Sequence, residues 1–306
     1  MHTYSKEITN KFKGTGVALV TPFNTDGSID YKGLENVINH VINGGVEYVV
    51  SMGTTGESVT LSEEEKFSVI DFTVKTVNKR IPVVAGFGGN NTNEIIQQIN
   101  RLSRMAASGN NGVDAILSNS PYYNKPSQEG IYQHYMAIDK ISPLPIILYN
   151  VPGRTSSNME AETTLRIAAD SKNIIGIKEA SGNFMQCMKI IRDADENFLV
   201  ISGDDPITLP FIATGMVGVI SVVANAFPKQ FSEMVRSCLK GDFISAKKSH
   251  LDLLEFTELI FKEGSPPGVK CALKQLGICG DNVRLPLWSI SDALADKISA
   301  AIKNIC

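Results

Sequence analysis

Short runs of β-branched and apolar residues recur along this chain about every 25 to 35 residues, separated by stretches with the spacing of amphipathic helices. This alternation is typical of successive βα units, in which helices cover a layer of parallel strands. Several runs are apolar throughout, as expected for strands buried on both faces. Eight runs are predicted to be strands: Gly16–Thr21, Tyr48–Met52, Val83–Gly86, Ala115–Asn119, Ile146–Asn150, Ile175–Lys178, Leu199–Ser202 and Gly218–Ser221.

Eight parallel units favour a closed (β/α)8 TIM barrel over an open sheet, because closure removes both edges. Ser62 followed by Glu65 is a capping box that marks the start of one helix. The helices predicted between strands include Asp30–Asn43, Ser62–Asn78, Thr92–Ser108, Gln128–Ile141, Ala161–Ala169 and Lys229–Leu239. We expect a barrel domain over residues 1–240 and a C-terminal helical domain over 241–306, with helices Phe243–Phe261, Val269–Leu276 and Ile290–Ile302.

The charges and cysteines narrow the class of protein. The 29 basic and 32 acidic residues give a net charge of −3, and the basic residues are scattered, which argues against a nucleic-acid partner. The five cysteines form no CxxC pair, so we expect reduced thiols and a cytoplasmic protein. The N-terminus has no signal-peptide core, and no apolar run approaches the ~20 residues of a membrane helix, so no membrane association is expected.

Lys178 ends the apolar run of the sixth predicted strand. A buried strand would deliver its amine into a pocket, where burial disfavours the charged form. A neutral amine can attack a carbonyl carbon and form a Schiff base, so the residue suits carbonyl chemistry without a metal. The alternative is a solvated lysine at the edge of a turn.

Other reactive side chains also fall at the C-terminal ends of predicted strands, where barrels of this kind carry their active sites. Each has a plainer alternative: a polar turn, a packed interface, a salt bridge or a helix cap. An arginine at such a place suits the capture of a carboxylate. These residues are Thr54 and Thr55 after the second strand, Tyr122 and Tyr123 after the fourth, Tyr149 and Arg154 at the fifth, and Asp204 and Asp205 after the seventh.

A metal site is not predicted. Among the strand ends only Asp204 and Asp205 place carboxylates close together, and the four histidines have no ligand spacing. The glycine-rich segment 86–91 lacks the ending of a phosphate-binding loop, so a turn is the safer interpretation.

Six motifs, in this order, closely resemble the dihydrodipicolinate synthase family over nearly the whole chain. They are GTTGES at 53–58, PYYNKPSQEG at 121–130, YNVPGRT at 149–155, GIKEASGN at 176–183, SGDD at 202–205 and GVISVVAN at 218–225. The resemblance implies a (β/α)8 barrel with a C-terminal helical domain, assembled as a homotetramer. The implied reaction condenses pyruvate with L-aspartate 4-semialdehyde, in the diaminopimelate route to lysine, and needs no cofactor because the imine is the electron sink.

The resemblance also implies roles for individual residues. Lys178 would form the imine and Tyr149 would carry protons to and from it, with Thr54 linking Tyr149 to a Tyr123 supplied by the neighbouring subunit. The substrate-binding residues implied are Thr55 for the carboxylate of pyruvate, Arg154 for that of the semialdehyde, Gly203 and Ile220 through their backbones, and Asp204 and Asp205 near the second substrate.

Two points separate this chain from relatives. N-acetylneuraminate lyase and 2-keto-3-deoxy sugar acid aldolases share the lysine and the tyrosine, but their polyhydroxylated substrates do not call for an arginine at 154. At the allosteric lysine site implied by the resemblance, Glu63 and Lys66 stand where sensitive enzymes carry histidines, so weak or absent inhibition is expected. The other positions matching that site are Ser58, Val59, Asn90, Glu94 and Tyr122.

Overall fold

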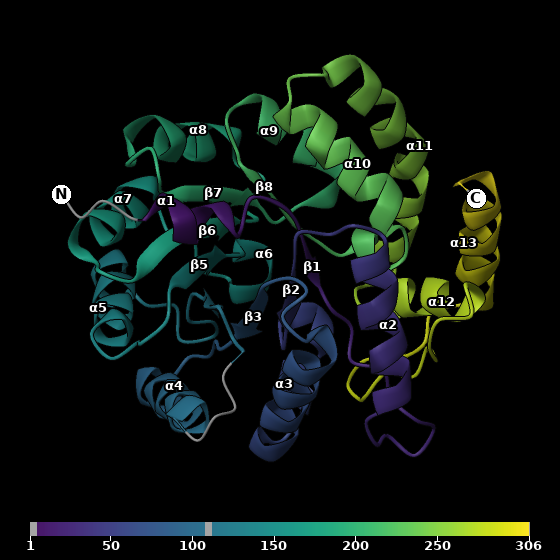
Figure 1. Cartoon of the computed structure of the whole chain (residues 1–306), viewed down its shortest axis with the longest axis horizontal. Coiled ribbons are helices and arrows are strands. Elements are labelled where there is room, and N and C mark those ends of the chain that lie inside the picture. The colour runs from purple at the N-terminus through teal and green to yellow at the C-terminus, as the bar shows by residue number, and fades with distance from the viewer. Residues whose placement is uncertain (1–4, 108–111, 306) are drawn as a thin grey trace.

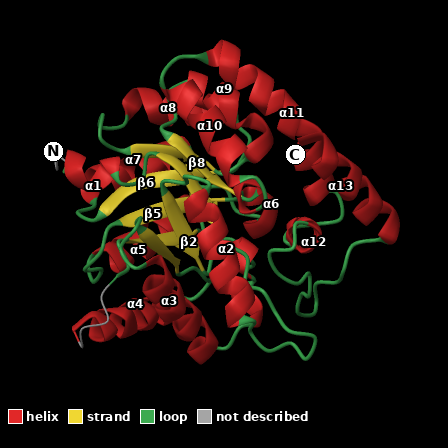
Figure 2. Cartoon of the chain, turned by 45° about the vertical axis from the view of Figure 1, so that its right-hand side comes forward, coloured by secondary structure: helices red, strands yellow, loops and turns green. Residues whose placement is uncertain are grey.

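The computed structural model describes residues 5–107 and 112–305, and in these residues eight parallel strands close into one barrel. Every strand pairs with the next, and β1 pairs with β8. Figures 1 and 2 show the strands at the centre of a ring of helices. The strands are β1 (Gly14–Ala18), β2 (Tyr48–Ser51), β3 (Val83–Gly86), β4 (Ala115–Asn119), β5 (Ile146–Asn150), β6 (Ile174–Glu179), β7 (Leu199–Ser202) and β8 (Gly218–Ser221).

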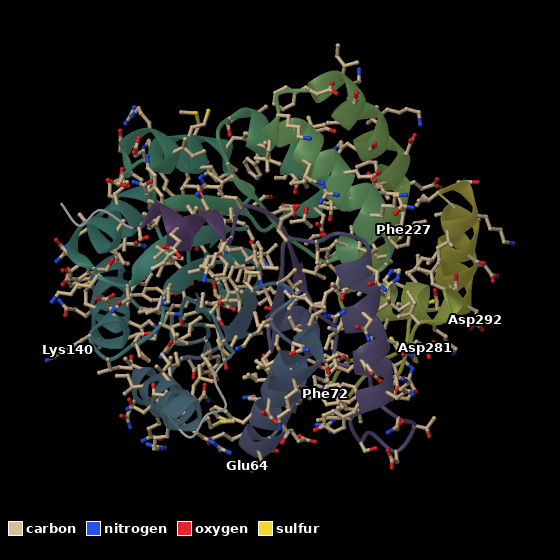
Figure 3. All side chains as sticks on the ribbon, viewed as in Figure 1. Glu64, Phe72, Lys140, Phe227, Asp281 and Asp292 are labelled. Carbon is tan, nitrogen blue, oxygen red and sulfur yellow. The ribbon has the colours of Figure 1, made fainter. Side chains whose placement is uncertain are left out.

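The helices of the ring follow the strands in order. Their inner faces pack on the barrel, and polar side chains such as Glu64 and Lys140 lie on the outside (Figure 3). Ser62 accepts a hydrogen bond from the Glu65 amide while Glu65 bonds back to Ser62, so the predicted capping box is confirmed. The helices of the ring are α1 (Lys6–Asn10), α2 (Tyr31–Asn43), α3 (Glu63–Val77), α4 (Thr92–Ala107), α5 (Gln128–Asp139), α6 (Pro152–Thr155), α7 (Ala161–Asp170), α8 (Phe184–Asp193), α9 (Thr208–Ala213) and α10 (Pro228–Leu239).

Three further helices follow the barrel: α11 (Phe243–Phe261), α12 (Pro267–Gln275) and α13 (Asp292–Ile305). They lie together on one side of the molecule, where α11 packs along α10 (Figure 1). Proline at the first position of α12 fits a helix start, where an amide hydrogen has no partner to lose. The predicted domain boundary at residue 240 falls at the turn between α10 and α11.

The predicted barrel is confirmed, with local corrections. The first strand begins at Gly14 and ends at Ala18 instead of spanning 16–21, because its pairing with β8 starts at Gly14 and Gly218. Leu19 and Val20 remain buried beyond the strand, which explains why the apolar run is longer than the strand. The predicted end of one helix at Ser108 lies outside the described residues.

None of the helices in the described part of the chain has the length and hydropathy needed to span a membrane.

Candidate active site

Lys178 and Tyr149 lie side by side at the C-terminal end of the barrel. They are directly paired across β6 and β5. The Lys178 Nζ atom lies 4.4 Å from the centroid of the Tyr149 ring, and the two residues are only 5% and 7% exposed. The alternative of a solvated lysine at a turn is therefore excluded. A buried amine against an aromatic face, with a phenol within the same pocket, is an arrangement suited to imine chemistry.

The residues that follow these two in their strands form a separate polar network. Asn150 and Glu179 are also paired across β5 and β6, and Asn150 Nδ2 donates to both Glu179 carboxylate oxygens at 3.2 and 3.0 Å. Glu179 also accepts from Gln186 Nε2 at 3.0 Å and from the Ser181 amide at 2.7 Å. Because successive strand residues point to opposite faces, this network lies behind Lys178 and Tyr149 and holds the two strand ends together.

The end of β7 comes close to the lysine. The Gly203 amide donates to the Glu179 carbonyl at 2.8 Å. A Cβ atom at position 203 would lie 2.9 Å from Lys178 Cε and 2.7 Å from Ala180 Cβ. Glycine is thus required at this position for the lysine side chain to occupy its place.

Lys178 lines a cavity of about 360 Å³ between the barrel mouth and the C-terminal helices. It contains both cationic and acidic groups, which suits a small substrate carrying charges of both signs. Val222 also lines this cavity, and the side chain of Ile220, for which a backbone contact is predicted, is buried within β8. The polar residues of the lining are Thr54, Thr55, Tyr149, Arg154, Lys178, Asp204, Asp205, Thr257, Glu258 and Ser265.

Arg154 reaches the cavity from the short helix α6. In the described part of the chain its guanidinium makes no ion pair, so the alternative of a salt bridge to a loop acid does not hold. An exposed guanidinium at a cavity wall is available for a carboxylate.

The two aspartates after β7 differ in their surroundings. Asp205 is buried, and its Oδ2 atom accepts from the amides of Val222 and Val223 at 2.9 and 3.2 Å, which ties the end of β7 to the segment after β8. Burial raises the pKa of the Asp205 carboxyl. Asp204 is half-buried, and burial together with the neighbouring Asp205 charge raises its pKa as well. Neither side chain caps the turn that follows, so the helix-cap alternative is not observed.

Thr54 and Thr55 lie in a 3-10 turn, Thr54–Gly56, directly after β2. Thr55 is buried and Thr54 is exposed to the cavity. The Gly56 carbonyl accepts from Thr21 Oγ1 at 2.7 Å, which fixes the turn to the segment after β1.

A second cavity of about 270 Å³ adjoins the first and shares Thr54, Tyr149, Val151 and Arg154 with it. Tyr122 and Ser58 line this second cavity, whereas Tyr123 lines neither and is 86% exposed. The chain therefore does not bring Tyr123 to its own Tyr149.

Asn90 and Glu94 lie outside both cavities, near the start of α4. The Asn90 carbonyl accepts from Asn124 Nδ2 at 3.1 Å, and Glu94 Oε1 accepts from Asn91 Nδ2 at 2.9 Å. Among residues 5–107 and 112–305, no group of three histidine, cysteine or acidic side chains is arranged to hold a metal ion.

Residues 11–305 match the model of the dihydrodipicolinate synthetase family. The chain belongs to this family. Members of the dihydrodipicolinate synthetase family are pyruvate-dependent lyases of the Schiff-base class, and the sequence-based prediction of that class is confirmed.

Three relatives show how closely the chain follows the dihydrodipicolinate synthetase family. A 4-hydroxy-tetrahydrodipicolinate synthase of Flavobacterium psychrophilum is 50% identical over 96% of this chain and 98% of its own length. The crystal structure of the chloride-inhibited dihydrodipicolinate synthase from Acinetobacter baumannii with pyruvate is 39% identical, with a TM-score of 0.90 over 96% of this chain and 98% of that one. A monomeric dihydrodipicolinate synthase variant is 36% identical, with a TM-score of 0.92 over 97% and 98%.

Proposed function

We propose that the chain catalyses the condensation of pyruvate with L-aspartate 4-semialdehyde to 4-hydroxy-tetrahydrodipicolinate, the reaction of the relative from Flavobacterium psychrophilum. The observation that carries the proposal is the buried Lys178 amine, 4.4 Å from the Tyr149 ring, in a cavity that also holds the Arg154 guanidinium. An amine, a phenol and a cation are what an enamine condensation of two carboxylate-bearing substrates needs.

In the first half of the reaction the Lys178 amine attacks the carbonyl carbon C2 of pyruvate. The carbonyl oxygen leaves as water, and the C2–N double bond of the imine forms. The protonated imine withdraws electrons from the neighbouring methyl group, which then loses a proton and gives the enamine. Tyr149, paired with Lys178 across the strands, is the group that carries these protons.

In the second half the enamine carbon attacks the aldehyde carbon of the semialdehyde. The aldehyde oxygen takes a proton and becomes the 4-hydroxyl group. The amino group of the former semialdehyde then attacks C2, closes the ring and displaces the Lys178 amine. One water leaves over the whole cycle, and the enzyme returns to its starting state.

The remaining polar residues of the cavity supply binding. Thr55 holds the carboxylate of pyruvate through its hydroxyl and amide, and Arg154 holds that of the semialdehyde. Gly203 and Ile220 contribute backbone contacts, while Asp204 and Asp205 lie toward the second substrate. Thr54 relays protons between Tyr149 and the neighbouring subunit's tyrosine.

We also propose a cytoplasmic homotetramer, built from dimers in which each subunit lends its exposed Tyr123 to the other. The 86% exposure of Tyr123 supports this exchange. Sedimentation at working concentration, together with mixed dimers of Lys178→Ala and Tyr123→Phe chains, tests it. Complementation between the two variants would support the exchange, and its absence in mixed dimers would contradict it.

Borohydride trapping tests the imine directly. The wild type, treated with pyruvate and borohydride, should gain one reduced pyruvate adduct, and peptide mapping should place it on Lys178. Lys178→Ala, folded by circular dichroism, should gain none. A wild type without an adduct would overturn the proposal.

The second substrate is tested separately. Because Arg154 suits a substrate that carries a carboxylate, we expect the enzyme that forms the pyruvate adduct to turn over with L-aspartate 4-semialdehyde. We expect no turnover with sugar acids. Cleavage of a 2-keto-3-deoxy sugar acid or of N-acetylneuraminate would favour the aldolase alternative instead.

A further inference from the structure

A buried ion pair outside the cavity connects the C-terminal helices to the barrel mouth. Glu57 lies two residues after Thr55, and Lys270 lies in α12. The Lys270 Nζ atom donates to Glu57 Oε1, and both side chains are fully buried. Two charges removed from water carry a large desolvation penalty, so such a pair contributes little net stability compared with apolar residues of similar size. Its presence therefore calls for a role other than stability.

Further contacts hold both members of the pair in position. Lys270 Nζ also donates to the Asn282 carbonyl at 2.8 Å and lies 4.3 Å from the centroid of the Phe23 ring. The second Glu57 oxygen accepts from the Arg284 amide at 3.1 Å. Burial acts to lower the pKa of Lys270, and the Glu57 charge opposes this change. The hydrogen bonds of the pair thus join the segment after β2 to residues 270–284.

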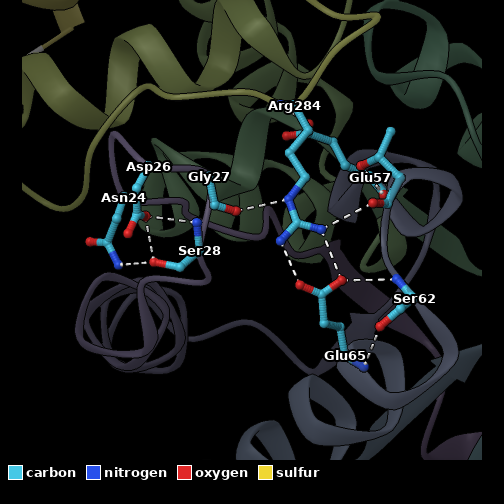
Figure 4. Close-up of polar contacts among 9 residues, drawn as sticks. Asn24, Asp26, Gly27, Ser28, Glu57, Ser62, Glu65 and Arg284 are labelled. Carbon is cyan, nitrogen blue, oxygen red and sulfur yellow. Dashed lines mark hydrogen bonds and ion pairs between the residues drawn. The ribbon is translucent and has the colours of Figure 1, made fainter.

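Arg284 extends the connection further along the same segment (Figure 4). Its guanidinium donates to both carboxylate oxygens of Glu65 at 2.9 and 2.6 Å, and to the Thr60 carbonyl at 3.0 Å. It also donates to the Gly27 carbonyl at 2.9 Å. Residues 57–65 are therefore held at both ends by the part of the chain that follows the barrel.

The backbone at Glu57 explains how this connection reaches the active site. Glu57 has φ 53° and ψ 33°, a left-handed conformation that is unfavourable for a residue with a side chain. It ends the 3-10 turn Thr54–Gly56, and its amide donates to the Thr54 carbonyl at 3.1 Å. The direction of the Thr55 amide and hydroxyl thus depends on a strained residue that the ion pair keeps in place.

We propose that Lys270 is a positioning residue that acts through Glu57 to fix the Thr54–Thr55 turn as a binding site for the carboxylate of the first substrate. The inference rests on the proposed function, since it assigns that turn to pyruvate. It makes the C-terminal helical segment part of the construction of the active site, although Lys270 touches no substrate.

The test compares three variants with a matched control. Lys270→Met leaves the Glu57 charge unpaired, Glu57→Gln leaves the ammonium unpaired, and the double variant Glu57→Gln with Lys270→Met removes both charges at similar volume. The control is Lys274→Met, one turn along α12, which removes an exposed pair with Asp281 at 3.0 Å. Thermal unfolding identifies which variants fold; the double variant is the one expected to keep most stability.

The kinetic readout is the KM for pyruvate set against kcat. In the folded double variant we expect the pyruvate KM to rise about tenfold or more with a much smaller change in kcat, since displacement of a positioning group by about 1 Å can cost up to about a hundredfold. The pyruvate concentration needed for half-maximal borohydride trapping should rise in parallel. Lys274→Met should match the wild type. A folded double variant with wild-type KM and trapping would overturn the inference.

Hydrogen exchange supplies a readout that does not depend on catalysis. Amides 54–60 should exchange faster in the double variant than in the wild type or Lys274→Met, while the strands of the barrel keep their protection. Unchanged exchange at these amides would overturn the inference even if the wild type formed no pyruvate adduct. A wild type without an adduct but with faster exchange in the variant would overturn the proposed function alone.

Discussion

Lys178 Nζ lies 4.4 Å from the centroid of the Tyr149 ring, across a pair of strands in which the two residues are direct neighbours. The distance places the amine over the ring face and the phenol at the same end of the barrel. One strand register therefore sets both groups of the proposed proton and imine chemistry.

Tyr149→Phe separates the contribution of the tyrosine ring from that of its hydroxyl group. The ring and its contact with Lys178 remain, but the phenolic proton donor is lost, so we expect kcat to fall about 10²- to 10⁴-fold. Trapping of the pyruvate adduct should persist at a lower rate. Tyr132→Phe, which removes a surface hydroxyl bonded to Asp170 at 2.9 Å, is the control and should keep wild-type turnover. Equal turnover in the two variants would show that Tyr149 carries no proton.

Gly203→Ala tests how closely the lysine is packed. Because the new methyl group would lie 2.9 Å from Lys178 Cε, the lysine must move. We expect imine trapping to slow by about tenfold or more, by analogy with other small misplacements of reacting groups. Gly280→Ala, where the nearest atom is 3.7 Å from the added carbon, serves as the control. Trapping at the wild-type rate in folded Gly203→Ala would contradict the prediction.

Arg154→Met should act on the second substrate alone. Loss of a charge-assisted contact to a carboxylate is worth about 1.5–3 kcal/mol, so the KM for the semialdehyde should rise about 10- to 100-fold while the pyruvate KM stays the same. Arg192→Met, which removes a surface pair with Asp193, is the comparison. A rise in the pyruvate KM of the same size would reverse the assignment of the two carboxylate sites.

The Glu65–Arg284 pair predicts a pH dependence of stability. The hydrogen bonds that Arg284 donates to Glu65 lower the pKa of the Glu65 carboxyl to about 2. The folded state thus favours the carboxylate: the contribution is fully present above the ordinary glutamate pKa of about 4.3 and is lost as pH falls toward 2.

Glu65→Gln measures this contribution. It retains an acceptor for the helix cap but loses the charge, and urea unfolding should show a deficit of about 1 kcal/mol at pH 6 that shrinks below about pH 4. Glu64→Gln is the control, because its pair with Arg101 is exposed. A deficit that is the same at pH 6 and pH 3 would contradict the assignment.

Inhibition by lysine is expected to be weak or absent. The Glu63 carboxylate is engaged by Arg101 Nη1 at 3.1 Å, and Lys66 adds a positive charge that repels the ligand's ammonium group. Initial rates with L-lysine up to about millimolar concentration provide the check. Strong loss of activity in that range would contradict the prediction.

The barrel could be predicted because each of its strands corresponds to a short apolar run in the local sequence. The limits of β3, β4, β5, β7 and β8 follow directly from apolar runs that end at a glycine or a polar residue. The sequence does not predict α1, α6 and α9, because helices of 5, 4 and 6 residues are too short to show a helical period. It also does not predict α8.

In the candidate site, too, the residues that follow a local pattern could be predicted and the long-range contacts could not. Lys178, Tyr149 and Arg154 could be placed from their positions at strand ends, whereas the partnership of Glu57 with Lys270 could not, because the two residues are separated by 213 positions. No local pattern connects charges so far apart. The glycine–threonine motif indicated a functional turn, but only the fold shows what holds it.

The layer formed by Asn150, Glu179 and Gln186 behind Lys178 and Tyr149 has a consequence for engineering. Side chains that face the cavity alternate with side chains that face the helices, so the two sets can be varied independently. A library that exchanges cavity positions around Arg154 for new aldehyde acceptors would leave the strand-end network untouched, and the lysine would keep its place while selectivity changes.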